Sequence, residues 1–252
     1  IECSAMSNEA LGEDFDIHCG GVDNIFPHHE NELAQSVCAN DGKFVNYWLH
    51  SEFLLVDGGK MSKSLKNFYT VNDLKQERFN PESVRYQLLS GHYRTKISFS
   101  LKKKLESEKL VRRFNDFNTM LLNNGANKIE HDQLPESYFE FSDAMNDDLN
   151  TPKALAVFFS WMKDQMKMLN TSSVIGDELG QSWNFMRIFN DIFALIREDR
   201  LKLPKNIKNL VNQRRVARDN RDWVLSDDLR NQISKEGWLI EDTPDGQKIK
   251  KL

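Results

Sequence analysis

The segment of residues 15–32 constrains the fold more than any other part of the chain. Residues 15–18 alternate apolar and polar side chains, as a half-buried β-strand does. Two glycines follow, Gly20 and Gly21, and glycines let the backbone approach a ligand closely. Pro27 then favours the first position of a helix, because its φ is fixed and it lacks an N–H. The segment therefore predicts a strand, a ligand-binding loop and a helix in immediate succession.

Two side chains of this predicted helix, His28 and Glu32, could share a metal ion. They are four positions apart and lie on one face, with Cβ atoms roughly 6 Å apart. Cys3, further upstream, could add a thiolate, which gives a Cys/His/Glu set of the kind that zinc accepts. The same spacing also fits a solvated helix start with polar residues near its N-terminus. Spacing alone does not decide between the two interpretations.

The composition fits a soluble protein that keeps its cysteines reduced. Of the 252 residues, 29% are charged and three are cysteines, Cys3, Cys19 and Cys38. Such a sparse, odd set does not form a disulfide framework. No apolar run approaches the ~20 residues that a membrane helix needs, and no leader argues for export. We therefore expect a cytoplasmic protein with no membrane contact.

Helical periodicity dominates from Val71 onward. Asn80-Pro81 predicts one helix start, a long helix is expected from about Ser98, and Thr151-Pro152 predicts a cap followed by a first helical residue. Three apolar stripes follow the helical repeat, which is typical of a helical bundle. The stripes are Leu110, Phe114, Phe117 and Leu121; Leu155, Phe159, Met162, Met166 and Leu169; and Phe185, Ile188, Ile192 and Leu195.

The last fifty or so residues predict a small mixed α/β unit. Two helical segments, roughly 205–220 and 223–236, end at Gly237. Trp238-Leu239-Ile240 has strand character, and residues 243–246 predict a turn into a final short strand.

A second motif, Gly58-Gly59-Lys60-Met61-Ser62-Lys63-Ser64, places two lysines around two hydroxyl groups behind a glycine hinge. Such a loop can bring the ammonium groups of Lys60 and Lys63 onto a polyphosphate, where they stabilise charge that develops in the transition state. The alternative is a basic surface turn, which an arbitrary pair of lysines usually forms.

These motifs resemble the C-terminal portion of a class I aminoacyl-tRNA synthetase, specifically of the cysteinyl-tRNA synthetase family, and the resemblance runs nearly end to end. The matching segments are Ile1-Glu2-Cys3-Ser4-Ala5-Met6, Phe15-Asp16-Ile17-His18, Phe26-Pro27-His28-His29-Glu30-Asn31-Glu32, Lys60-Met61-Ser62-Lys63-Ser64 and Asp147-Asp148-Leu149-Asn150-Thr151-Pro152.

The resemblance implies that Cys3, His28 and Glu32 are three of the four ligands of one Zn2+ ion per chain. It assigns the fourth ligand, a cysteine, and the family's H-I-G-H signature to an N-terminal segment that this chain lacks. We therefore expect the chain to be inactive by itself. In the family, the zinc ion binds the thiolate of the substrate L-cysteine, and a borderline-soft cation can separate sulfur from the oxygen of serine.

The resemblance also implies an ATP site. Asp23 would accept hydrogen bonds from the ribose, with Gly20 and Gly21 admitting the nucleotide. Lys63 would contact the phosphates of ATP, bound with Mg2+, and Lys60 would support it.

Two positions depart from the family pattern and one role stays open. Cys19 and Lys66 stand where the family usually has glycine, so Cys19 could crowd the adenosine and Lys66 could stiffen the loop or add charge near phosphate. His18 is expected either to be structural or to support a ligand residue.

At the other end of the chain, the resemblance assigns tRNA anticodon recognition to Arg218, Trp223, Asp227 and Asp242. Trp223 and Asp227 are four positions apart, so one helix face offers a stacking plane beside a carboxylate, which suits single-stranded RNA. The net charge of -4 is unfavourable to nucleic-acid binding as a whole, but residues 202–221 hold seven basic residues against one acid. The alternative is that Trp223 is a buried core aromatic.

The implied fold is a partial Rossmann-like α/β catalytic domain, a mainly α-helical anticodon-binding bundle and a small α/β C-terminal subdomain. We expect the zinc site and lysine loop in residues 1–78, a connecting region in 79–97, the bundle in 98–200 and the anticodon-recognition subdomain in 201–252. The implied activity is ATP-dependent activation of L-cysteine to cysteinyl-adenylate and its transfer to tRNA(Cys), by a monomer.

Two other functions are open at this stage. One is an ATP-dependent ligase that joins cysteine to an amino sugar, which would share both motifs but would not need an anticodon-reading tail between Arg214 and Asp242. The other is a non-catalytic tRNA-binding module, which would not need the candidate zinc ligands or the lysine loop.

Overall fold

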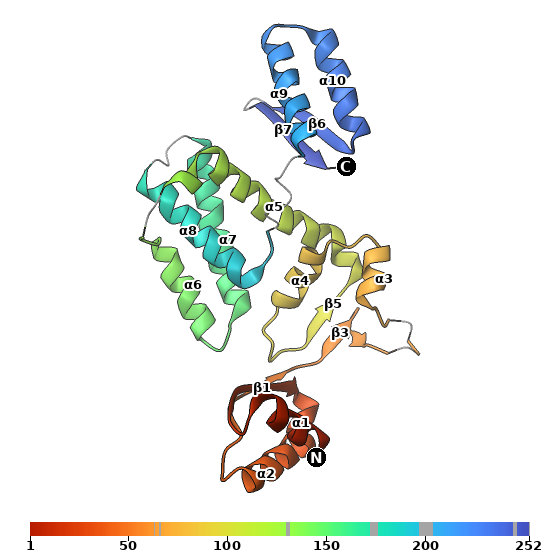
Figure 1. Ribbon diagram of the computed structural model, residues 1–252, viewed down its shortest axis with the longest axis vertical. Coiled ribbons are helices and arrows are strands. Elements are labelled where there is room, and N and C mark those ends of the chain that lie inside the picture. Colours follow the sequence, from red (N-terminus) through yellow and green to blue (C-terminus); the bar gives the residue numbers. More distant parts are fainter. Residues whose placement is uncertain are drawn as a thin grey trace. The chain divides into compact units, whose positions relative to one another are not determined.

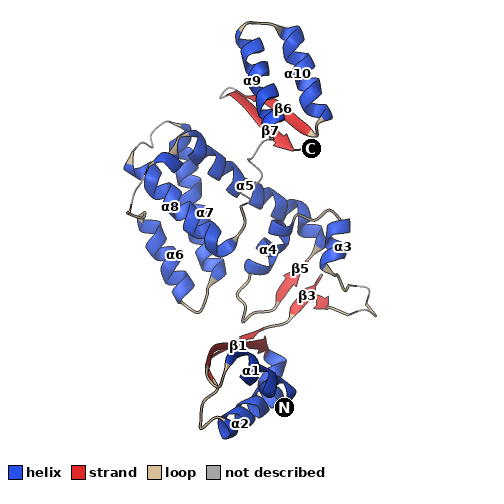
Figure 2. Ribbon diagram, viewed as in Figure 1, coloured by secondary structure: helices blue, strands red, loops and turns tan. Residues whose placement is uncertain are grey.

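The computed structural model describes residues 1–62, 64–65, 67–129, 132–171, 176–196, 204–243 and 246–251. They form two compact units, Ile1–Ile196 and Arg197–Leu252 (Figure 1). Helices predominate in both units, and the strands form small sheets (Figure 2).

The first unit begins with a strand–helix–strand arrangement. Strands β1 (Phe15–Gly21) and β2 (Val45–Ser51) pair in parallel, with Phe15 opposite Val45 and Gly21 opposite Ser51. Helix α1 (Glu2–Leu11) precedes β1, and α2 (Glu30–Ala39) connects the two strands, as parallel pairing requires. The predicted succession of strand, loop and helix is thus confirmed.

The loop between β1 and α2 contains two short helical turns, Val22–Asn24 and Ile25–His29. Phe26 interrupts the second turn with φ -132° and ψ 132°, so the helical run that carries His28 starts after it, as expected of Pro27. On α2, Cys38 is exposed, and the buried residues are Glu32 and Ser36.

A second sheet has the strand order β4-β3-β5. Strands β3 (Leu54–Val56) and β4 (Gly59–Lys60) form a hairpin that turns at Asp57 and Gly58, and β5 (Ile97–Phe99) adds to β3 in parallel. Helices α3 (Val71–Gln76) and α4 (Pro81–Leu89) lie between β4 and β5 in the chain. The side chain of Asn80 caps α4 by accepting a hydrogen bond from the Glu82 N–H. The sequence pattern does not predict β5.

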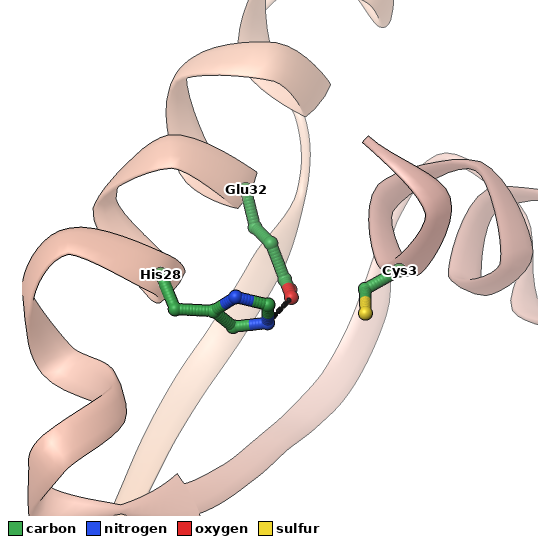
Figure 3. A group of neighbouring side chains, drawn as sticks. All are labelled: Cys3, His28 and Glu32. Carbon is green, nitrogen blue, oxygen red and sulfur yellow. Dashed lines mark ion pairs between the residues drawn. The ribbon is translucent and has the colours of Figure 1, made fainter.

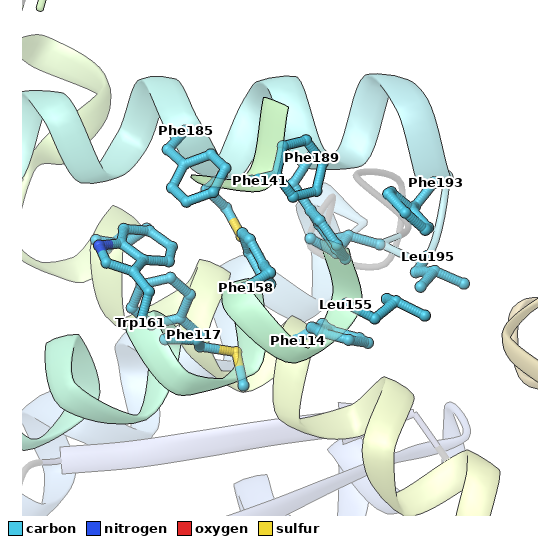
Figure 4. Packing of buried hydrophobic residues seen from close by; sticks show 14 of the residues in the cluster. Phe114, Phe117, Phe141, Leu155, Phe158, Trp161, Phe185, Phe189, Phe193 and Leu195 are labelled. Atoms are coloured by element: carbon cyan, nitrogen blue, oxygen red, sulfur yellow. The ribbon is translucent and has the colours of Figure 1, made fainter. Parts of the chain in front are cut away.

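In the rest of the first unit, the described residues form a bundle of four helices: α5 (Lys104–Asn123), α6 (Glu136–Asn146), α7 (Thr151–Asn170) and α8 (Asp177–Phe193). The short turns Leu101–Lys103 and Ala126–Lys128 flank α5. An aromatic core fills the bundle, and the rings of Phe158 and Phe189 stack with their centroids 3.6 Å apart (Figure 4). The predicted bundle is confirmed.

Three details of the predicted bundle are wrong. The long helix begins at Lys104 rather than near Ser98, because β5 and a short turn come first. The cap of α7 is Asn150, whose side chain accepts from the Lys153 N–H, so Thr151 is already helical. Of the third predicted stripe, Phe185 and Leu195 are buried as expected, but Ile192 is 45% exposed. The other buried side chains on α8 include Met186, Phe189 and Phe193.

The second unit consists of helices α9 (Lys205–Asp219) and α10 (Trp223–Lys235) and the antiparallel strands β6 (Trp238–Thr243) and β7 (Gly246–Lys251). Asp242 on β6 lies opposite Gln247 on β7. This is the small α/β unit that the sequence predicts. Within the predicted turn, Pro244 and Asp245 lie outside the described residues.

None of the helices in the described part of the chain combines the length and the apolar character that a membrane span needs.

Candidate functional site

The three predicted zinc ligands come together in the first unit. Cys3 on α1, His28 in the turn before α2 and Glu32 on α2 offer one sulfur, one nitrogen and one oxygen that all lie within 4.8 Å of one another. In Figure 3 the thiol of Cys3 on α1 points toward the side chains of His28 and Glu32. The arrangement depends on α1 and α2 packing together, which the sequence alone does not define.

The carboxylate of Glu32 is the buried centre of this group, since only 3% of the residue is exposed. Its Oε1 lies 2.7 Å from His28 Nε2, and its Oε2 lies 2.8 Å from His18 Nε2. His18, for which the sequence leaves a structural or a supporting role open, therefore contacts a candidate ligand residue directly.

The donor set fits zinc. Ligands of a tetrahedral zinc ion, with bonds of about 2.0–2.3 Å, lie roughly 3.3–3.8 Å apart. To enclose the ion, the His28 nitrogen and the Glu32 oxygen, now 2.7 Å apart, must separate slightly, while the longest separation in the group, at most 4.8 Å, must shorten. Sulfur, nitrogen and oxygen are all donors that zinc accepts in proteins. All three cysteines of the chain are exposed free thiols, and of these Cys3 is the one that belongs to the group.

A buried histidine, His29, packs beside this group. Its Nδ1 lies 2.7 Å from His50 Nε2, so one of the two rings must donate and the other accept. Burial, together with the neighbouring rings of His18 and His50, lowers the pKa of His29 and favours its neutral form. A Cβ at Gly20 would lie only 2.5 Å from the His29 ring, so Gly20 must remain a glycine for this packing.

Asp23 occupies the turn that directly follows β1, and its side chain is exposed. A Cβ on Gly21 would collide with the Asp23 carboxylate, so this glycine leaves room for the carboxylate to fold back over the loop. The structure thus places Gly20, Gly21 and Asp23 at the carboxyl end of a parallel strand, where ligands bind in open α/β sheets.

The lysine loop is held in shape by Asn67, a residue that the sequence pattern does not single out. The Asn67 side chain accepts from the Ser62 N–H at 2.8 Å and donates to the Lys60 carbonyl at 3.0 Å. Lys60 ends β4, and its Nζ lies 6.0 Å from the centre of the Phe53 ring. Lys63 and Lys66, on which two expectations rest, lie outside the described residues.

In the second unit, Asp242 is surrounded by arginines. Arg214 pairs with it through both terminal nitrogens, at 2.8 and 2.9 Å, while Arg230 and Arg218 approach its Oδ2 at 2.8 and 3.2 Å. The hydrogen bonds from Arg214, together with the charges of Arg218 and Arg230, lower the pKa of Asp242 to about 2. Arg214 is fully buried (0% exposed), which is unusual for an unpaired arginine and typical of a paired one.

Trp223 lies at the start of α10 and is 55% exposed, so it is not the buried core aromatic that was the alternative. The guanidinium carbon of Arg218 lies 5.5 Å from the centre of the indole ring, within the range of a cation–π contact. Asp227 lies four residues further along the helix, with an oxygen 3.7 Å from Arg230.

The structure therefore brings together Arg218 with Trp223, Arg218 with Asp242, and Asp227 with Arg230. Sequence reasoning missed Arg214 and Arg230 as members of this cluster. The available signal was their spacing, because Arg214 is one helical turn before Arg218 and Arg230 is two turns after Trp223.

Two family models match the chain. Residues 1–109 match the family described as tRNA synthetases class I (C) catalytic domain, and residues 140–197 match the DALR domain.

Curated relatives match over the full chain. The chain is 39% identical over 258 residues to a cysteine--tRNA ligase of Protochlamydia amoebophila (strain UWE25), which covers 100% of this chain and 54% of that protein. It is 40% identical over 263 residues to a cysteine--tRNA ligase of Brachyspira hyodysenteriae (strain ATCC 49526 / WA1), covering 100% of this chain and 55% of that protein. The chain thus spans about half the length of the curated relatives it matches.

Among solved structures, the fold is similar to that of the agnB2 LeuRS of Agrobacterium radiobacter K84, solved as a ternary complex with tRNA and LeuAMS. The TM-score is 0.57 at 15% sequence identity, over 71% of this chain and 26% of that one.

Proposed function

We propose that the chain is part of a cysteine–tRNA ligase, because residues 1–109 match the class I (C) tRNA synthetase catalytic domain model and residues 140–197 match the DALR domain model. The reaction is the activation of L-cysteine with ATP to cysteinyl-adenylate, followed by transfer of the cysteinyl group to tRNA(Cys). The observation that carries the proposal is the meeting of Cys3, His28 and Glu32 within 4.8 Å.

These three residues hold one Zn2+ ion per chain in our proposal. Glu32 is suited to the role because His18 orients its carboxylate, and supporting contacts of this kind fix ligands in metal sites. When bound, the ion supplies a partner that prefers the thiolate of L-cysteine to the hydroxyl of serine, a choice that an apolar pocket makes poorly. The lowered pKa of the buried His29 favours its neutral form beside this group, and Gly20 provides the space that the His29 ring occupies.

ATP, with Mg2+, binds at the carboxyl end of β1 in this proposal. Asp23 accepts hydrogen bonds from the ribose, and the absence of side chains at Gly20 and Gly21 lets the nucleotide approach. Lys60 and Lys63 neutralise the phosphates as pyrophosphate leaves. The side chain of Asn67 supports this role by fixing the backbone of Lys60 and Ser62 at the base of the loop.

The second unit binds the anticodon of tRNA(Cys) in this proposal. Trp223 offers an exposed ring on which an unstacked base can lie, and the Arg218 guanidinium lies beside this ring. Asp242 pairs with Arg218 and Arg230, and Asp227 pairs with Arg230, so both carboxylates belong to the same cluster and can take part in recognition. Stacking on an aromatic ring beside hydrogen-bonding side chains is how single-stranded RNA is usually recognised. The protein acts as a monomer in the cytoplasm, with L-cysteine, ATP and tRNA(Cys) as its substrates.

An aminoacylation assay on a complete protein that contains this chain tests the proposal. With equal concentrations of radiolabelled cysteine and serine, cysteine should be attached to tRNA(Cys) at least a hundredfold faster than serine, since a hydrophobic pocket alone gives roughly that limit. Cysteine-dependent exchange of pyrophosphate into ATP should proceed without tRNA. Equal charging with both amino acids, or no exchange with any amino acid, would contradict the proposed function.

A further inference from the structure

The Asp242 carboxylate in the second unit has already used most of its capacity to accept hydrogen bonds. Oδ1 accepts from Arg214 Nη1, and Oδ2 is approached by nitrogens of Arg214, Arg218 and Arg230. A carboxylate offers about four lone-pair positions in total, and four arginine nitrogens already face this one. These contacts hold the carboxylate in a fixed position among the three arginines.

Asp242 therefore positions arginines. Arg214 is completely buried and pairs with both of its oxygens, which fixes the carboxylate in one orientation. Removing Asp242 would leave the buried charge of Arg214 without its partner, so the pair is held in place. The second oxygen of this fixed carboxylate then orients the side chains of Arg218 and Arg230.

Among the side chains that the structure describes, this cluster carries a surplus of one positive charge. Three guanidinium groups, of Arg214, Arg218 and Arg230, face two carboxylates, of Asp242 and Asp227. The side chains of Arg218 and Arg230 are 34% and 44% exposed. Each guanidinium group has five N–H donors, of which Asp242 takes only a part, so donors remain for a ligand.

The exposed ring of Trp223 adjoins this surplus through Arg218. A nucleotide has the complementary structure, since its base stacks on an aromatic ring and its phosphate accepts from guanidinium groups. We propose that Arg230, together with Arg218, binds a backbone phosphate of the RNA strand whose base stacks on Trp223, while Asp242 and Arg214 position the two arginines. This inference rests on the proposed function, in which the second unit binds tRNA.

The test measures binding of an RNA hairpin, the anticodon stem–loop of tRNA(Cys), to the full 252-residue chain by fluorescence anisotropy at several salt concentrations. A second hairpin with a changed anticodon reports on base reading. Arg230→Gln should weaken binding of both hairpins about tenfold in low salt, because a phosphate contact is independent of sequence. It should also reduce the slope of log K against log salt by about 0.7, the value of one single-strand phosphate contact.

Two further variants sharpen the comparison. Lys235→Gln removes one positive charge from the same helix, about 140° around its axis from Arg230, and should change neither hairpin's affinity by more than about twofold. Arg230→Lys keeps a charge but loses the forked donor geometry, so it should retain the salt slope and lose less affinity than Arg230→Gln.

The outcomes separate this inference from the proposed function. If the unaltered chain binds the hairpin while Arg230→Gln leaves affinity and salt slope unchanged, the phosphate contact is wrong and the tRNA-binding proposal stands. A loss confined to the cognate hairpin would make Arg230 a base-reading residue and would also overturn the inference. If the unaltered chain binds neither hairpin, both the inference and the proposed tRNA-binding role fail.

Discussion

Arg94 Nε lies 2.6 Å from Asp148 Oδ2, which fixes the segment before β5 to the turn between α6 and α7. Tyr93 strengthens the contact between these two segments, because its hydroxyl donates a hydrogen bond to Asp148 Oδ1 at 2.5 Å. That bond, with the adjacent Arg94, holds the pKa of Asp148 below its ordinary value. Asp148 also has a positive φ of 54°, a conformation that aspartate and asparagine adopt more readily than most residues.

Asp148→Asn therefore keeps the backbone conformation and removes the charge. We expect a lower melting temperature at pH 7 in low salt and a smaller difference at 1 M salt, because this exposed ion pair is screened. The depressed pKa means that the stabilisation is present above about pH 4 and is lost as the pH falls through the folded value. Thermal unfolding at both salt concentrations checks this, with Asp143→Asn on α6 as the control. A difference that salt and acid leave unchanged would contradict it.

Cys3→Ser and His28→Ala should each lower the zinc content of the purified chain, because each removes one of three donors. Cys38→Ser is the matched control, since Cys38 is equally exposed but lies outside the donor group, and it should retain the metal. Mass spectrometric metal analysis after dialysis measures the content. In the complete protein, His28→Ala should raise the KM for cysteine more than the KM for ATP. Unchanged zinc in both variants would count against the ligand assignment.

Gly20→Ala should destabilise the chain by about 1–3 kcal/mol, the usual cost of forcing an extra group into a packed site. The new methyl group would lie within 3 Å of two atoms of the buried His29 ring. Gly59→Ala is the control, because its methyl group would meet its nearest neighbours at an ordinary 3.7 Å. Urea unfolding measures both. Equal stability of the two variants would show that the His29 ring moves aside without cost.

Phe189→Ala should cost about 3–5 kcal/mol of the free energy of unfolding, as is usual for a fully buried phenylalanine. Ile192→Ala on the same helix should cost about 1 kcal/mol or less, because Ile192 lies largely outside the core. Chemical denaturation followed by circular dichroism distinguishes the two. The opposite order of costs would favour the stripe that the sequence predicted.

The stability of the second unit should fall in acid because of Asp242. Its pKa of about 2 in the folded chain lies below the ordinary value of 3.8, so its contribution is complete above about pH 4 and is lost between pH 4 and pH 2. Asp242→Asn should lower stability at neutral pH and flatten this part of the pH profile. Unfolding monitored by tryptophan fluorescence at several pH values tests it. A variant that keeps the full acid dependence would place the titrating group elsewhere.

Long stretches with a helical repeat of apolar residues predicted the helices correctly. Very short elements, and the buried face of a helix with two adjacent apolar stripes, could not be predicted in this way. Strand β5 escaped prediction because three residues are too few to show a period, and its pairing depends on β3, which lies about forty positions earlier in the chain. On α8, two apolar stripes run side by side, so spacing could not decide whether Ile192 or Phe193 faces the core. That choice is made by the rings of α7 and α6.

In the candidate sites, too, local spacing was predictable from the sequence and tertiary contacts were not. His28 and Glu32 could be paired from the sequence because both are set by one helical turn, and the structure bears out that pairing. The cluster around Asp242 could not be predicted, because it depends on β6 returning beside α9 and α10. Arg214 and Arg230 acquire their significance only from that tertiary contact.

The ligand set proposed for zinc also has a mechanical consequence. Cys3 and Glu32 are separated by 29 positions and belong to different helices, so an ion that both of them hold acts as a cross-link between α1 and α2. Closing such a loop removes conformational entropy from the unfolded chain. Chelation should therefore loosen the first forty residues before the aromatic bundle, and amide hydrogen exchange in α1 should accelerate while exchange in α7 stays slow.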